Sequence, residues 1–126
     1  LVQTVPLDGV VIVSTPQEVA LADALKGVNM FKLDTINVPI VGLVENMSWF
    51  TPLQHPDEKY FIFGKNGGQT LADEFSVPLL TQIPLIKEVG ELAEQGKAFS
   101  ALDNKDLKLV FEQLAKVVVA FCEEKK

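Results

Sequence analysis

Three short runs of apolar, mostly β-branched residues mark the first two thirds of the chain. They cover residues 10–14, 38–44 and 77–84. Runs without polar alternation are typical of strands whose two faces are both covered, as in parallel sheets. We therefore predict three parallel strands, with the run over residues 10–14 as a central strand.

Between the first two runs, the apolar positions follow the helical repeat. Residues 17–32 carry apolar side chains three and four positions apart, and Pro16 suits a first helical turn. A helix of this length between two strands indicates a βαβ unit over residues 9–45, for which a right-handed crossover is expected.

Three more helices are predicted in the second half of the chain. One opens at the glycine-rich stretch 64–68, and a short one covers residues 87–95 and ends at Gly96 as a left-handed cap. Asp103 can cap a last helix that runs to about Glu124. The apolar stripe of that helix consists of Leu107, Val110, Phe111, Leu114, Val117, Val118 and Phe121.

The alternation of strands and helices predicts the fold class. Residues 45–59 lack periodicity and are expected to form a loop, and residues 60–63 a short edge strand. The whole is an α/β chain with an open, mostly parallel sheet and helices on both faces. Residues 1–126 form a single segment without an internal repeat or a linker.

Composition and charge exclude several classes of function. The chain is 48% hydrophobic and 22% charged, which is typical of a folded domain. Its net charge of −6, with eleven lysines and no arginine, disfavours binding of nucleic acid or an anionic membrane and provides no arginine finger. A single cysteine, Cys122, excludes an internal disulfide and fits a cytoplasmic location.

Two further features bear on where the protein works. The apolar runs are shorter than the roughly 20 residues that span a bilayer, and no export signal is visible at the start. The first residue is Leu1 rather than methionine, so we expect a piece of a larger protein.

Candidate chemistry is sought where the predicted strands end, because open α/β sheets bind ligands beyond the carboxyl ends of their strands. Those ends are residues 14–17, 45–49 and 84–87. Asn46 follows the second strand directly, and its amide can both donate to and accept from the edge of a base. An asparagine at this place can equally be a turn residue bonded to its own backbone.

Three other conspicuous features have a structural interpretation. The stretch 64–70 resembles a phosphate loop only superficially, because Gln69 stands where that motif requires lysine, and we interpret it as a flexible strand-to-helix turn. Trp49 and Phe50 are either tucked against the sheet or exposed as a contact patch, and we expect them to be tucked. His55 has no partner for metal binding and fits a solvated loop.

Several sequence blocks resemble, in order and spacing, the Mrp/ApbC family of MinD/ParA-like P-loop ATPases. The blocks are residues 8–17, 22–27, 39–48, 63–68 and 77–85, so that the resemblance covers about residues 1–99. It implies the C-terminal portion of a larger P-loop ATPase domain. The Walker A half and the magnesium-linked aspartates lie upstream in that family, and this segment alone should not hydrolyse ATP.

The resemblance also implies a function and a site. The family is assigned to iron–sulfur cluster carriage, so the full-length protein is expected to bind and hydrolyse ATP with magnesium, to form a homodimer and to serve iron–sulfur client proteins. Asn46 matches the residue that recognises adenine, and Pro84, Leu85 and Ile86 match the loop beside the base. Gln17 matches a position near the nucleotide and the dimer face.

Two departures from the family pattern stand out. Many members follow the Glu-Asn-Met-Ser block with a Cys-x-x-Cys pair that binds a cluster between two subunits, but residues 51–56 contain no cysteine. Thiolates are the usual ligands of such clusters, so this route lacks its ligands here. Ile86 stands where members often carry aspartate. A noncatalytic interaction or dimerisation module built on Trp49 and Phe50, and a chromosome-partitioning-like ATPase, are the alternatives.

Overall fold

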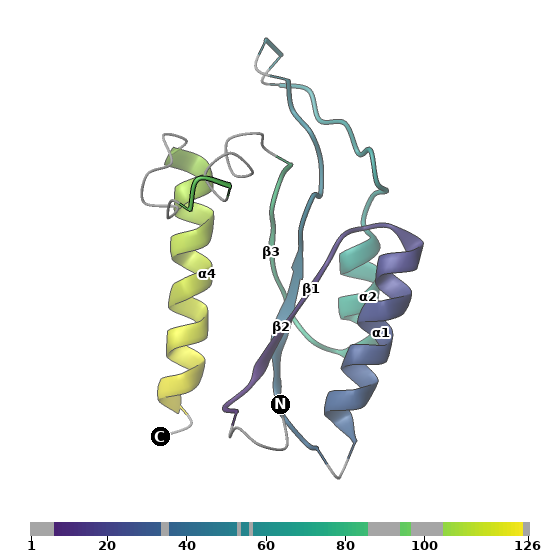
Figure 1. Ribbon diagram of the computed structural model, residues 1–126, viewed down its shortest axis with the longest axis vertical. Helices are drawn as coiled ribbons and strands as arrows, with labels where there is room; N and C mark the ends of the chain where they lie inside the picture. Colours follow the sequence, from purple (N-terminus) through teal and green to yellow (C-terminus); the bar gives the residue numbers. More distant parts are fainter. Residues whose placement is uncertain are drawn as a thin grey trace.

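The computed structural model describes residues 7–33, 36–52, 54–55, 57–85, 94–96 and 105–124. Its elements, shown in Figure 1, are strands β1 (Val10–Ser14), β2 (Ile40–Glu45) and β3 (Leu79–Gln82) and helices α1 (Glu18–Lys32), α2 (Gly67–Phe75) and α4 (Lys105–Glu124). Each lies where the periodicity predicted it.

The three strands form one parallel sheet in the order β1–β2–β3. Ser14 is paired with Glu45, and Glu45 with Gln82, so all three strands end at the same edge of the sheet. The predicted central position of β1 is wrong, because β2 is the middle strand and β1 an edge strand of the described sheet. An apolar run reports that helices cover a strand's faces, and it does not reveal whether strands flank it on both sides.

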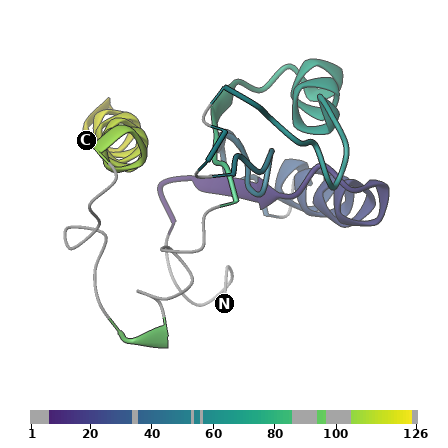
Figure 2. The ribbon, with the colours of Figure 1, turned by 90° about the horizontal axis from the view of Figure 1, so that it is seen from above.

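Helices cover both faces of the sheet, as predicted. Figures 1 and 2 show α1 and α2 on one face and α4 on the other. Successive residues of β2 point to opposite faces, so Leu43 packs with Ala24, Leu71 and Ala72. Its neighbour Val44 packs on the other face, in a cluster with Ile83 and Leu107. The apolar run of β2 is thus explained by two separate cores.

Two predicted elements differ in detail. Residues 60–63 form no strand, because only Tyr60 makes an isolated antiparallel bridge, to Phe50. On α4, Val117 is 42% exposed although it was assigned to the apolar stripe of this helix. It lies beside the line through Leu114 and Phe121 that faces the sheet. A list of the apolar residues of a helix does not separate the centre of the stripe from its margin.

The end of the predicted short helix can be assessed only in part. Gly96 has a φ of +69°, the left-handed conformation expected of a helix cap. Most of the predicted helix over 87–95, and the predicted cap at Asp103, lie outside the described residues. Within the described part of the chain, none of the helices combines the length and apolar character needed to cross a bilayer.

Candidate functional site

A hollow of about 380 Å³ lies at the edge of the sheet where β1 and β2 end. We call it the strand-end hollow, and it is lined by Val13, Ser14, Thr15, Ala20, Asp23, Ala24 and Asn46. Its volume falls in the range of small-molecule sites, roughly 300–1,000 Å³. The residues come from the end of β1, one side of α1 and the residue that follows β2. The hollow therefore occupies the place at which open α/β sheets bind ligands.

Asn46 is fixed in this hollow by its backbone and its side chain. Its backbone N–H donates a 2.7 Å hydrogen bond to the carbonyl of Ser14, which ties it to the end of β1. Its Oδ1 accepts a 2.9 Å hydrogen bond from the N–H of Met47. Asn46 is thus a turn residue, yet Oδ1 keeps a second lone pair and Nδ2 two donors with which it can address a ligand.

The residue after Asn46 carries backbone strain. Met47 has a φ of 54°, a left-handed conformation that costs about 1–2 kcal/mol for a residue with a Cβ. Ser48 holds the chain on the far side, because its N–H donates to the carbonyl of Ile83 at 2.9 Å and its hydroxyl to that of Glu45 at 3.0 Å. Strain that is held in place by its surroundings is a feature of binding and catalytic loops.

The other predicted site residues lie around Asn46 but do not all meet in one cavity. Gln17 is exposed at the start of α1, where its Oε1 accepts a 3.4 Å hydrogen bond from Thr15 of the hollow. Leu85 donates its backbone N–H to the carbonyl of Trp49 at 2.7 Å, so Leu85 and the half-buried Pro84 adjoin the loop that Asn46 begins. None of these three lines the hollow. Ile86 lies outside the described residues.

The polar groups of the hollow determine which ligands it suits. Asp23 is the charged residue of the lining, which contains no lysine. Carboxylate and carbonyl oxygens accept hydrogen bonds from amino and hydroxyl groups, whereas a phosphate would be repelled by Asp23. The hollow fits the base or sugar of a nucleotide better than its phosphates. Asp23 was not among the predicted site residues, because nothing in the sequence distinguishes it from the other exposed acids of a helix.

The glycine-rich turn, residues 64–68, is packed against the ends of the same strands. The N–H of Gly68, in the first turn of α2, donates a 2.6 Å hydrogen bond to Oε2 of Glu45. A Cβ atom built on Gly67 would lie 2.9 Å from the carbonyl oxygen of Pro16, and one on Gly64 equally close. These glycines allow close packing against Pro16 and Glu45, so the stretch is a turn that is packed in place rather than flexible. It leads into α2 as predicted, but the described residues 60–63 just before it form no strand.

Glu45 was not predicted as a site residue, although its side chain is the most buried charged group of the described chain. It is 1% exposed, and its Oε1 accepts a 3.2 Å hydrogen bond from Nε2 of Gln82. An acidic residue that ends an apolar strand is the signal that sequence reasoning could have used, because a buried carboxylate requires partners.

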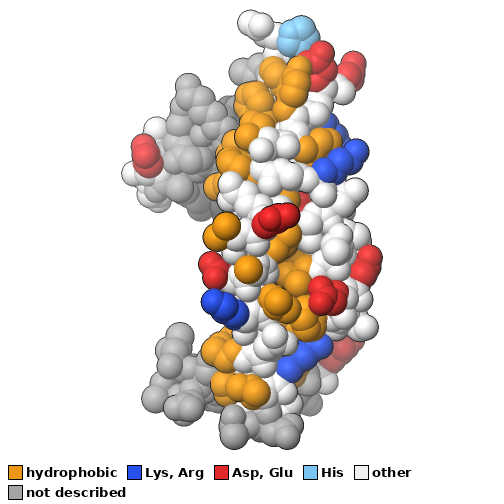
Figure 3. All heavy atoms as spheres, turned by 90° about the vertical axis from the view of Figure 1, so that its right-hand side faces the viewer, with side chains coloured by type: hydrophobic (Ala, Val, Ile, Leu, Met, Phe, Trp, Pro, Cys, Tyr) orange, Lys and Arg blue, Asp and Glu red, His pale blue; other side chains and the backbone are white. Residues whose placement is uncertain are grey.

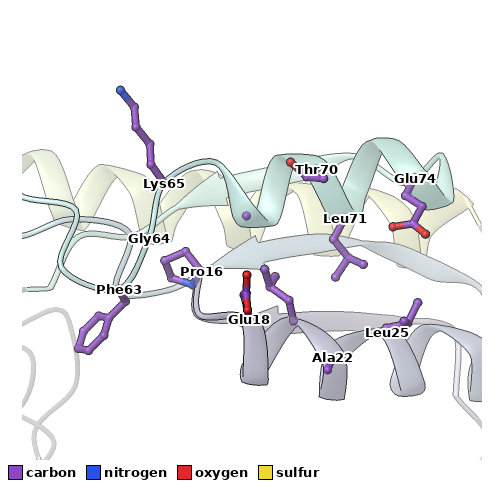
Figure 4. Close-up of a pocket in the computed structure, with 12 residues that line it drawn as sticks. Pro16, Glu18, Ala22, Leu25, Phe63, Gly64, Lys65, Thr70, Leu71 and Glu74 are labelled. Atoms are coloured by element: carbon purple, nitrogen blue, oxygen red, sulfur yellow. The ribbon is translucent and has the colours of Figure 1, made fainter.

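A larger groove of about 540 Å³ lies between α1 and α2. Figure 3 shows apolar side chains along this side of the molecule, with charged side chains beside them. In Figure 4, Leu71 of α2 points toward α1, whereas Lys65 points away from the groove. Its floor is formed by leucines, and it contains none of the predicted site residues. The polar and charged side chains of its lining are Glu18, Lys65, Thr70 and Glu74.

The loop after Asn46 exposes part of its aromatic content. Trp49 is half-buried, with Nζ of Lys59 4.2 Å from the centre of its ring. Phe50 is 37% exposed, and Tyr60, its bridge partner, is 49% exposed. The prediction that both aromatic residues are tucked in is therefore wrong for Phe50. The backbone of Phe50 bridges Tyr60 on one side and Leu85 on the other. These bridges hold the main chain of Phe50 in place and leave its ring exposed.

Metal-binding groups are not gathered in the described chain. His55, Asp57 and Glu58 are exposed, as expected of a solvated loop, and no cluster of three or more potential ligands occurs among the described residues. Cys122 is half-buried on α4. The thiolates that an iron–sulfur cluster requires are thus not supplied by these residues.

Comparisons with known proteins identify the family. Residues 1–119 match the ParA family described as NUBPL iron-transfer P-loop NTPase. The chain is 48% identical over 95 residues to the iron–sulfur cluster transfer protein NUBPL of Dictyostelium discoideum, covering 75% of this chain and 28% of that protein. It is 40% identical over 116 residues to the iron–sulfur cluster carrier protein of Pseudomonas fragi, covering 91% and 39%. The chain thus spans well under half the length of these relatives.

A solved structure supports the fold. The nucleotide-binding protein of Archaeoglobus fulgidus, determined in complex with ADP and with cobalt, superposes with a TM-score of 0.61 at 31% identity. The match covers 71% of this chain and 36% of that protein. The predicted resemblance and the predicted fold class are both confirmed.

Proposed function

Because the chain belongs to the NUBPL iron-transfer P-loop NTPase family, we propose that it forms the base-side wall of an adenine nucleotide site. The full-length protein would bind and hydrolyse ATP with magnesium and carry iron–sulfur clusters to client proteins. The observation that carries this proposal is the position of Asn46 in the strand-end hollow, with its backbone hydrogen-bonded to the end of β1.

The chemistry of the hollow supports adenine as the bound group. Adenine presents an amino donor and ring-nitrogen acceptors, and the amide of Asn46 can accept from the first and donate to the second. Asp23 can accept hydrogen bonds from hydroxyl groups of a sugar. We expect ATP to bind more tightly than GTP, since guanine carries a carbonyl where adenine carries the amino group.

The phosphates and magnesium would be held by another segment of the full-length protein. This chain has no arginine, and its one glycine-rich turn directs the N–H of Gly68 at Glu45 rather than outward. Among the described residues, no strand pairs with the outer edge of β1, and a further strand of the full-length protein would pair there, beside the hollow. A phosphate loop contributed there would place the triphosphate next to the base-side wall.

Several parts of the proposal rest on the family and on composition. Nucleotide occupancy would switch a homodimer, as in ATPases whose γ-phosphate orders neighbouring segments. The cluster is cargo in this account, and further thiolate ligands would come from outside this 126-residue chain, because its sequence has one cysteine, Cys122. A reducing cytoplasm is the location that fits this cysteine content.

The test is a titration of the full-length protein with ATP. Asn46→Ala should weaken ATP binding by about tenfold, the loss expected for a good hydrogen-bonding contact. Asn29→Ala, at an exposed position of α1, is the matched control and should leave the affinity unchanged. Wild-type affinity in Asn46→Ala would remove the assignment of this residue to the base.

A second candidate function is a noncatalytic interaction module. The observation in its favour is the exposure of Phe50, Tyr60 and Ile62, at 37%, 49% and 59%, with Phe50 and Tyr60 joined by a backbone bridge. Exposed apolar clusters of this kind mark protein contact sites. Normal ATP turnover by the full-length protein would exclude this function as its whole role, and unchanged partner binding by Phe50→Ser would exclude the patch.

A further inference from the structure

We propose that Glu45 is a positioning residue that holds Asn46 in the geometry needed to recognise the base. This inference rests on the proposed function. The two residues are adjacent, and Glu45 does not line the strand-end hollow, so it does not touch the bound group in this account. It would act through the backbone and through the elements that its carboxylate joins.

The carboxylate of Glu45 links three elements of the fold. It extends from the end of β2, where Oε2 accepts from the N–H of Gly68 in α2 at 2.6 Å. Oε1 accepts from Nε2 of Gln82, the last residue of β3, at 3.2 Å. Both oxygens therefore have a donor, and the side chain is 1% exposed. A buried carboxylate held in this way fixes the distances between the elements that it bridges.

The backbone of Glu45 closes the turn that contains Asn46. Its carbonyl accepts from the N–H of Ile83 at 2.8 Å and from the hydroxyl of Ser48, which is fully buried, at 3.0 Å. Asn46 and Met47 thus lie between two anchored residues, and Met47 is held at a φ of 54°. Loss of the carboxylate would remove its hydrogen bonds to Gly68 and Gln82, so that the ends of β2 and β3 could shift against each other. Such a shift would allow Met47 to relax to a more favourable conformation and would turn the amide of Asn46 away.

The glycine at position 68 is what allows the carboxylate to reach the helix. A Cβ atom built there would lie 2.6 Å from Oε2 and 3.0 Å from Cβ of Glu45. The amide at the first turn of a helix favours a negative group, which makes the contact specific for an acceptor at this place. The oxygen of a carboxamide of the same shape can therefore accept this hydrogen bond in place of the carboxylate, whereas a methyl group cannot.

The experiment compares the affinities of the full-length protein for ATP and GTP in Glu45→Ala, Glu45→Gln and the control Glu112→Ala. Glu112 is an exposed acid on α4. Glu45→Ala should lose about tenfold in ATP affinity while GTP binding changes little, so that the preference for ATP falls. Glu45→Gln should keep most of the preference, because its Oε1 can accept from Gly68 and a flipped Gln82 amide can accept from its Nε2. Glu112→Ala should match the wild type.

A role confined to stability predicts a different result. Loss of folded protein would lower the apparent affinities for both nucleotides by one factor and leave their ratio unchanged, and that outcome in Glu45→Ala would overturn the inference. Should Glu45→Ala fail to fold, Gln82→Ala decides, because it removes one of the two donors and leaves Glu45 in place. A reduced ATP preference in Gln82→Ala supports the inference, and an unchanged preference contradicts it.

The failure of this inference can be told apart from the failure of the proposed function. If Asn46→Ala itself leaves the preference for ATP intact, the base-reading role of Asn46 is wrong. Alternatively, Asn46→Ala abolishes the preference for ATP, while folded Glu45→Ala, or Gln82→Ala in its place, retains it. In that case Asn46 recognises the base as proposed, but Glu45 does not position Asn46.

Discussion

The N–H of Gly68 donates a 2.6 Å hydrogen bond to Oε2 of Glu45 and so joins the first turn of α2 to the end of β2. Hydrogen bonds to charged groups contribute about 1.5–3 kcal/mol, and a buried acceptor left without its donor is costly. This contact explains why a glycine-rich turn that superficially resembles a phosphate loop faces inward. The amide of Gly68 thus serves the fold of this segment and is not available to a phosphate.

A side chain at position 68 should therefore destabilise the protein. In Gly68→Ala, the new methyl group would lie 2.6 Å from Oε2 of Glu45, and we expect the free energy of unfolding to fall by about 1–3 kcal/mol. Chemical denaturation measures the change. Gly27→Ala is the matched control, since the nearest atom to its methyl group, Cδ1 of Ile12, would be 3.8 Å away and alanine favours a helix interior by about 1 kcal/mol. Equal stability of both variants would contradict the close contact at Gly68.

The central strand should be sensitive to loss of volume. Leu43 is fully buried between β2 and the helices α1 and α2, and we expect Leu43→Ala to lower the free energy of unfolding by about 2–5 kcal/mol. Leu109 of α4 is 51% exposed, and Leu109→Ala should cost less than about 0.5 kcal/mol. Denaturation of both variants under the same conditions makes the comparison. A smaller loss for Leu43 than for Leu109 would be incompatible with the described core.

Tyr60 should show a pH dependence set by its neighbour. Its hydroxyl donates a 2.5 Å hydrogen bond to Oε2 of Glu58, and this bond, with a smaller effect of desolvation, raises the pKa of Tyr60 above its ordinary value of 10.0. The folded state thus favours the protonated phenol. The resulting stabilisation is fully present below pH 10 and is lost as the pH rises through the raised pKa.

The corresponding variant is Glu58→Ala, in which the pKa of Tyr60 should move down toward 10.0. The ultraviolet absorbance of the ionised phenol, followed as a difference between variant and wild type, reports the change. Glu74→Ala removes another exposed acid and is the control for net charge. The hydrogen bond to Glu58 would be refuted as the cause if both variants titrated Tyr60 at the same pH as the wild type.

The sequence was sufficient for the three strands, for helices α1, α2 and α4 and for the layers of the fold, but the strand predicted over residues 60–63 is not formed. Residues 40–44 are apolar on successive positions because both faces of β2 are covered, and that pattern is visible without coordinates. The run over residues 10–13 is equally apolar, yet Val13 of β1 is 60% exposed. The edge position of β1 could not be predicted from the sequence, because the polarity of a strand does not show which strands are hydrogen-bonded beside it. Val117 was misassigned for a related reason, because apolar residues beside a helix stripe are not distinguished from those within it.

The candidate site was predictable only at the level of position. Asn46 could be placed at the sheet edge because it follows a strand, and its backbone contact with Ser14 agrees with that placement. The places of Asp23 and Glu45 in the site depend on which helices and strands are neighbours in the fold, and pattern analysis of a single sequence does not give that information. Asp23 reads as an ordinary helix acid, and the burial of Glu45 arises from packing against Gly68 and Gln82.

The central claim is that the base of an adenine nucleotide lies in the strand-end hollow, and nuclear magnetic resonance tests it directly. Isotope-labelled full-length protein is titrated with ADP, and the backbone amide shifts of the hollow and of the α1–α2 groove are compared. We predict the largest changes at Ser14, Thr15 and Asn46. Largest changes at Leu21, Thr70 and Leu71 of the groove, with an undisturbed Asn46, would contradict the account.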